Sequence, residues 1–159
     1  MKKLLLEAAR WAVALTAVIS LAVMFRSAPI SDADPNAVRE AVTARMDLTN
    51  VLEADNQMIR RLYGLDISAY ESCILYYPAT NLGAEELLIV KLADPELGDT
   101  VRAAVEARLK TQKNTFDGYG VEQTDLLNNH AVVEVRGNYV LFVVGQTAEQ
   151  VRQAFLDAL

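Results

Sequence analysis

The residues of this chain that could perform catalysis are few and stand far apart in the sequence. His130 is the only histidine and Cys73 the only cysteine, so the usual histidine-containing metal sites and Ser-His-Asp triads would depend on one residue. Cys73 could act as a nucleophile only beside an activating base, and its apolar neighbours favour a place in the core. His130 is expected as a polar residue at a strand edge. These residues predict no catalytic, metal or cofactor site.

Acidic residues gather at two places where acid–base chemistry or calcium binding is conceivable. Glu85 and Glu86 are adjacent, and adjacent side chains on a strand point to opposite faces, so they cannot work as a paired acid and base. Asp94, Glu96 and Asp99 fall at the start of an expected helix, where acidic side chains complement the helix dipole. A hydrolase with an unfamiliar site around Glu86 or His130 stays open as an alternative.

Tyrosines offer a better lead, because a tyrosine combines a large contact area with a polar tip. Tyr139 lies in an expected hairpin, on the face opposite the core. The candidate interaction face there consists of Tyr139, Leu141, Arg136, Glu134 and Val143. A half-apolar sheet face can bind a partner, but helices near the N-terminus could equally cover it.

The hairpin is indicated by Gly137-Asn138, which is typical of a two-residue type II′ turn between the apolar stretches Ala131–Arg136 and Tyr139–Val144. The register should pair Arg136 with Tyr139 and continue in step along both strands. The expected core face carries Val133, Val135, Val140, Phe142 and Val144.

Other elements follow from apolar spacing and capping residues. Two apolar stretches, Ile74–Tyr77 and Leu87–Leu92, enclose a turn-rich segment and are expected as antiparallel neighbours. The longest helix should run from Asp94 to about Lys113, with Leu97, Val101, Val105 and Leu109 on one face. Shorter helices are expected after the cap Asp34, over Glu53 to Leu62, and after Thr147, which forms a capping box with Gln150. Gly64 should stop the helix that contains Glu53 to Leu62. The secondary structure of Val121–Asn129 is ambiguous in the sequence, with one or two helical turns as an option.

This order of elements, ββαββα, predicts an α+β fold: a two-layer domain over residues 37–159, with an antiparallel sheet and packed helices. Beyond residue 26 the chain has 11 basic and 20 acidic residues, a net charge of −9. Such an excess of negative charge argues against binding to nucleic acid or to anionic lipid. A single cysteine also excludes an internal disulfide.

The N-terminal segment predicts a membrane anchor. Trp11 to Phe25 carries no charge, and Leu4 to Phe25 would extend about 33 Å as a helix, enough to span a bilayer. Lys2, Lys3 and Arg10 precede the apolar run, which places the N-terminus in the cytoplasm and the main domain outside. We expect residues 1–26 as an uncleaved signal anchor and transmembrane helix, and residues 27–36 as a juxtamembrane linker. Signal-peptidase cleavage is the alternative.

Small residues recur every four positions within the expected anchor: Ala8, Ala12, Thr16 and Ser20. Small side chains let two membrane helices approach closely, so this stripe predicts a weak homodimer. The other interpretation is that small residues are simply common in bacterial membrane helices.

Several short motifs show a resemblance to a known family. They are Leu62-Tyr63-Gly64, Glu86 at the start of the apolar strand Leu87 to Val90, Phe116 with Tyr119, and Gly137-Asn138-Tyr139-Val140. From about Leu48 to its end the chain resembles the bacterial domain of unknown function DUF4358, which is found largely in Firmicutes. The resemblance implies a small exported protein with an N-terminal anchor or lipoprotein signal. It implies no activity, cofactor or catalytic residue.

These observations favour a membrane-anchored extracytoplasmic protein of the bacterial cell envelope that binds a partner, expected to be another envelope protein, without catalysis. Two alternatives stay open: an envelope hydrolase, and a structural subunit that pairs through its membrane helix.

Overall fold

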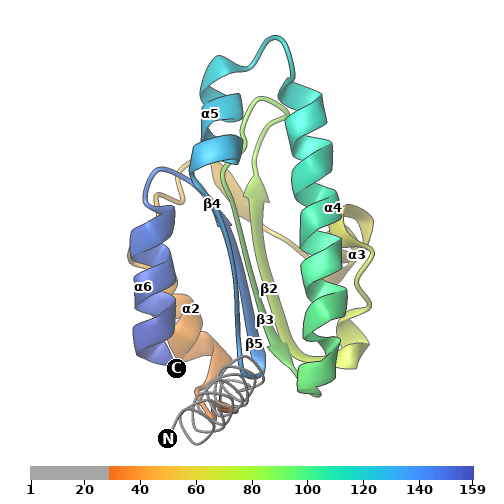
Figure 1. The fold of residues 1–159 in the computed structure, drawn as a ribbon, viewed down its shortest axis with the longest axis vertical. Helices are drawn as coiled ribbons and strands as arrows, with labels where there is room; N and C mark the ends of the chain where they lie inside the picture. Colours follow the sequence, from red (N-terminus) through yellow and green to blue (C-terminus); the bar gives the residue numbers. More distant parts are fainter. Residues whose placement is uncertain (1–28) are drawn as a thin grey trace, which may run out of the picture.

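The computed structural model describes residues 29–159, whose centre is a five-stranded antiparallel sheet (Figure 1). The strands lie in the order β1-β2-β3-β5-β4. Their bounds are Val51–Glu53 for β1, Tyr70–Pro78 for β2, Glu86–Leu92 for β3, Ala131–Arg136 for β4 and Tyr139–Val144 for β5. The predicted α+β class and both predicted antiparallel pairs are confirmed.

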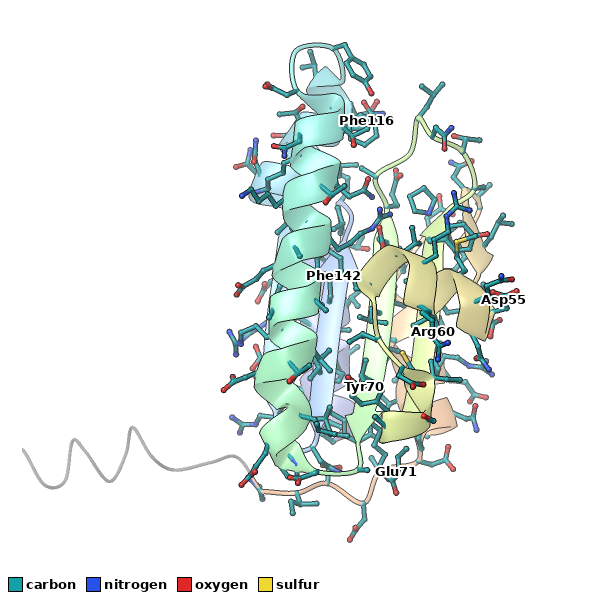
Figure 2. All side chains as sticks on the ribbon, turned by 90° about the vertical axis from the view of Figure 1, so that its right-hand side faces the viewer. Asp55, Arg60, Tyr70, Glu71, Phe116 and Phe142 are labelled. Carbon is teal, nitrogen blue, oxygen red and sulfur yellow. The ribbon has the colours of Figure 1, made fainter. Side chains whose placement is uncertain are left out.

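Helices cover both faces of this sheet, so the predicted two-layer arrangement is wrong and the domain has three layers (Figure 1). One face packs against α3 (Asn56–Tyr63), α4 (Gly98–Phe116) and α5 (Val121–Asn129). The other face packs against α2 (Pro35–Thr43) and α6 (Ala148–Ala158). In Figure 2, α4 and α3 lie across the near side of the sheet.

The second helical layer has a cause in the central strands. Every residue of β5 is buried, and so are Leu87 to Val90 of β3. A strand with one wet face alternates apolar and polar residues, whereas a continuous apolar run requires cover on both faces. Val140 and Phe142 face the α3–α4–α5 layer, while Tyr139 and Leu141 face α2 and α6.

Local signals in the sequence set several of the element ends as predicted. The Asp34 carboxylate accepts hydrogen bonds from the first turn of α2, and Gly64 ends α3 in the left-handed conformation. Gly137 has φ 57° while Asn138 has a negative φ, which is the pattern of a type II′ turn. The hairpin register, Arg136 opposite Tyr139 through Val133 opposite Phe142, is also confirmed.

Other local predictions were wrong. Thr147 makes no capping hydrogen bond to α6, and its hydroxyl donates to the Arg45 carbonyl at 2.7 Å. Glu53 belongs to the short edge strand β1 rather than to a helix, and α3 starts at Asn56 after the cap Asp55. Ahead of α4, Pro95–Leu97 form a single 3₁₀ turn, and α4 itself continues to Phe116.

The segment before α2, predicted as part of a linker, is held against the domain. The Ser31 amide donates to Asn138 Oδ1 at 2.8 Å, and Asn138 Nδ2 donates back to the Ser31 carbonyl at 3.1 Å. The Ser31 hydroxyl donates to the carbonyl of Leu159, and the Tyr139 hydroxyl to that of Ala33. These bonds tie residues 31–33 to the hairpin turn and to the last residue of the chain.

The predicted anchor, residues 1–26 with the stripe Ala8, Ala12, Thr16 and Ser20, lies outside the described residues. Within residues 29–159, no helix combines the length and the apolar character that crossing a membrane requires.

Candidate functional site

Glu86 is a fully buried carboxylate at the first position of β3. Arg108 of α4 donates to it from Nε at 3.1 Å and from Nη2 at 2.9 Å. The Tyr63 hydroxyl donates at 2.6 Å and Gln112 Nε2 at 3.0 Å. These three donors satisfy a charge that burial alone would make very costly.

Burial and Glu86 together fix the protonation states of this cluster. Burial, then the charge of Glu86 and its hydrogen bond, raise the pKa of Tyr63 well above the ordinary value, so Tyr63 stays a neutral donor. Burial alone lowers the pKa of Arg108, but the hydrogen bonds and charge of Glu86 outweigh this, and the net pKa is raised. Tyr63 is therefore a neutral hydrogen-bond donor beside the Glu86–Arg108 salt bridge.

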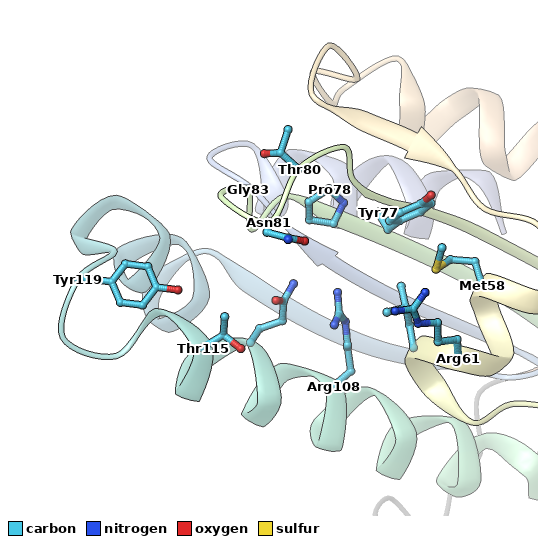
Figure 3. A pocket seen from close by; sticks show the side chains of 12 residues that line it. Met58, Arg61, Tyr77, Pro78, Thr80, Asn81, Gly83, Arg108, Thr115 and Tyr119 are labelled. Carbon is cyan, nitrogen blue, oxygen red and sulfur yellow. The ribbon is translucent and has the colours of Figure 1, made fainter.

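A cavity of about 470 Å³ opens beside this cluster, between α3, α4 and the loop that joins β2 to β3 (Figure 3). Arg108 and Gln112 form part of its wall, so the buried ion pair borders the cavity directly. The rest of the lining is half apolar and half polar: Met58, Arg61, Leu62, Tyr77, Pro78, Thr80, Asn81, Gly83, Thr115 and Tyr119. Ligand pockets in proteins commonly have this size.

Arg108 keeps one nitrogen free of the ion pair. Its side chain is only 12 % exposed, and its Nε and Nη2 bond to Glu86, but Nη1 makes no hydrogen bond within residues 29–159. In this part of the chain no fully buried side-chain nitrogen or oxygen lacks a partner. Nη1 is therefore not fully buried, and Arg108 is one of the residues that line the cavity.

The charged side chains that line the cavity are both arginines, and its other ionisable side chains are tyrosines. Arg61 and Arg108 line it, and among residues 29–159 no aspartate or glutamate does. Arg61 is exposed and, within the described chain, forms no ion pair, in contrast to its neighbour Arg60, which lies 3.1 Å from Asp66. The cavity thus concentrates positive charge on an acidic domain.

Comparison with known proteins adds one finding. The family described as Domain of unknown function (DUF4358) matches residues 44–145. The chain belongs to DUF4358. No curated protein and no solved structure matches it. The matched range includes Tyr63, Glu86, Arg108 and Gln112, and therefore the whole cluster.

The predicted interaction face is mostly interior in this DUF4358 domain. Tyr139, Leu141 and Val143 are 0–1 % exposed beneath α2 and α6. The sequence left open cover by helices near the N-terminus, which α2 provides, whereas α6 is the C-terminal helix. Glu134 pairs with Arg152 of α6 at 2.8 Å. Arg136, at the hairpin turn, is exposed. In the described structure these residues therefore form no common surface.

The two residues considered for nucleophilic or metal chemistry lie outside the cavity lining. His130, at the end of α5, has Nε2 3.6 Å from an Asp125 carboxylate oxygen. Cys73, on β2, packs against the core on the side of the sheet that α3, α4 and α5 cover. Among residues 29–159, no three His, Cys, Asp or Glu side chains are grouped to hold a metal ion.

The environment of Cys73 predicts an unreactive thiol. Burial raises its pKa to about 12, so at pH 8 it holds about a thousandfold less thiolate than an ordinary cysteine. We expect slow labelling by an aromatic disulfide reagent in the native DUF4358 domain and fast labelling in urea, followed by absorbance of the released thiolate. Comparable rates in both conditions would show that Cys73 is accessible.

The sequence missed the cavity because its key residues lie on an unexpected helix face. Successive residues spaced four apart on an α-helix are each rotated by about 40° around the helix axis, so they do not stay on one face. The buried face of α4 instead follows Val101, Val105, Gln112 and Phe116, with the half-buried Arg108 between them. One signal in the sequence could have indicated the site. Gln112 is a polar residue on the helix face that Val101, Val105 and Phe116 otherwise make apolar.

Proposed function

We propose that this protein is a membrane-anchored, extracytoplasmic binding domain, and that the cavity between α3, α4 and the β2–β3 loop is its binding site. The observation that carries the proposal is the buried Glu86–Arg108 ion pair in the cavity wall. A fixed, partly open guanidinium suits ligand recognition, because its orientation is set before the ligand arrives.

The lining favours binding over catalysis. Its cations are two arginines, which stay protonated at any physiological pH and cannot exchange protons with a substrate. Glu86, the acid of the alternative hydrolase, has both oxygens occupied by Arg108, Tyr63 and Gln112. His130, the other residue of that alternative, does not line the cavity.

The location rests on the N-terminal sequence, whose apolar run and preceding lysines favour a cytoplasmic N-terminus and an exported domain. A cysteine placed on the exposed surface tests this directly. Asn114→Cys on α4 should react with a membrane-impermeant maleimide on intact cells, because Asn114 is exposed in the structure. The unmodified chain, whose Cys73 has a raised pKa, supplies the background. Labelling only after lysis would contradict an extracytoplasmic domain.

The binding site is tested by filling the cavity. Thr115 lines it and is exposed, so Thr115→Trp should occupy the space without disturbing the core. Native mass spectrometry of the full chain released from membranes should show a bound small molecule or peptide that Thr115→Trp lacks. Asn114→Trp, next along α4 but outside the lining, is the matched control and should keep it. The same adduct in all three proteins would place binding elsewhere.

A further inference from the structure

The charges around the cavity restrict what it can hold. Arg61 and Arg108 bring two positive charges, and the buried Glu86 directly behind Arg108 brings one negative charge. We propose that the cavity recognises a carboxylate, bound between Arg108 Nη1 and Arg61. This inference rests on the proposed function and names the ligand class of that site.

Charge balance separates a carboxylate from a phosphate. The three charges sum to one positive charge, which a carboxylate neutralises, whereas a phosphate dianion leaves an excess negative charge. That excess would sit in a domain that already carries a net charge of −9 beyond residue 26. The site is therefore matched to a singly charged anion.

Glu86 acts on this site as a positioning residue. Two nitrogens of the Arg108 guanidinium bond to the Glu86 carboxylate, so the plane of the guanidinium is fixed and the third nitrogen keeps one direction. Tyr63 and Gln112 hold the carboxylate from other sides. The Arg108 side chain therefore loses its conformational entropy when the domain folds, and ligand binding does not have to order it.

The remaining lining indicates what accompanies the carboxylate. Met58, Leu62, Tyr77 and Pro78 present apolar atoms on the side of α3 and β2, and Figure 3 shows Met58 and Tyr77 at the same end of the cavity as Arg61. Thr80, Asn81, Thr115 and Tyr119 bring hydroxyl and amide groups at the other end. An apolar or aromatic side chain next to the carboxylate, followed by an amide, matches this order. Both a free acylated amino acid and the C-terminal residue of a protein have that chemistry.

The test uses the full chain in detergent micelles and isothermal titration calorimetry with four probes: N-acetyl-phenylalanine, its neutral carboxamide, phenyl phosphate, and an acetylated eight-residue peptide that ends in phenylalanine with a free carboxylate. N-acetyl-phenylalanine should bind about tenfold more tightly than the carboxamide, because only the acid forms charge-assisted hydrogen bonds. It should also bind more tightly than phenyl phosphate.

Variants on α3 identify the group responsible. Arg61→Gln should weaken carboxylate binding about tenfold and leave carboxamide binding unchanged, since only the charge contact is lost. Arg60→Gln is the matched control: it removes the same charge from the neighbouring position, where the side chain pairs with Asp66 and does not line the cavity. Arg60→Gln should bind every probe as the wild-type chain does.

The outcomes separate this inference from the proposed function. Equal affinity for acid and carboxamide, or tighter binding of phenyl phosphate, overturns the carboxylate assignment but leaves the cavity as a binding site. Failure of all four probes to bind, while Thr115→Trp still removes a co-purified ligand, also overturns only the carboxylate assignment. Failure of all probes, with no ligand lost in Thr115→Trp, counts against the proposed function itself. Tighter binding of the peptide than of N-acetyl-phenylalanine supports a protein C-terminus as the source, and equal binding supports a free acid.

Discussion

Replacing Glu86 by alanine is expected to lower the free energy of unfolding by about 3–5 kcal/mol, the typical cost of removing one partner from a buried ion pair. The substitution leaves Arg108 only 12 % exposed and without its counter-charge, and it also removes the acceptor for Tyr63 and Gln112. Urea denaturation followed by circular dichroism measures this change.

Two controls show whether the loss belongs to the ion pair. Glu85→Ala changes a half-buried neighbour whose carboxylate, within residues 29–159, accepts only from the Ala84 amide, and it should cost less than about 1 kcal/mol. Replacing Glu86 and Arg108 together by leucine should recover part of the stability, because no isolated charge then remains in the interior, although Tyr63 and Gln112 still lack their acceptor. A cost below about 1 kcal/mol for Glu86→Ala would mean that water enters the cluster and replaces the carboxylate.

Leu141→Ala and Phe142→Ala are expected to destabilise the domain by similar amounts, about 2–5 and 3–5 kcal/mol respectively. The two residues are neighbours on β5 and point to opposite faces, yet each is 0–1 % exposed. Leu141 packs with α2 and α6, and Phe142 packs with α3, α4 and α5. The same denaturation measurement compares them.

Leu82→Ala is the matched control for Leu141→Ala, since Leu82 is 71 % exposed in the β2–β3 loop and should change stability by no more than about 0.5 kcal/mol. A Leu141→Ala cost as small as that of Leu82→Ala would show that α2 and α6 do not cover the sheet in solution.

Sequence reasoning predicted the parts of this fold that depend on local chemistry. Asp34, Gly64 and Gly137 each act on residues within a few positions, so their effects can be identified without tertiary information. The third layer could also have been inferred, because six successive apolar residues in β5 are incompatible with a sheet that has one face exposed to solvent. β1 could not, since a strand of three residues is too short to show alternation.

The candidate site was beyond sequence reasoning for a different reason. Tyr63, Arg108 and Gln112 lie 22–26 residues from Glu86 in the chain, and only the packing of α3 and α4 beside β3 brings them to one carboxylate. Glu86 itself stands before an apolar strand, where a glutamate usually marks a solvated strand end. Its burial follows from partners that no local pattern indicates.

The bonds from Ser31 to the hairpin turn also fix where the segment before α2 lies relative to the cavity. The turn at Gly137-Asn138 lies beside the carboxyl end of β3, whereas the β2–β3 loop, which borders the cavity, lies at the amino end. The seven residues of β3 separate these ends by roughly 20 Å, at about 3.3 Å per residue. Residues 31–33 and the β2–β3 loop thus lie at opposite ends of the sheet, so a molecule bound at residues 31–33 would leave the loop side of the cavity unobstructed.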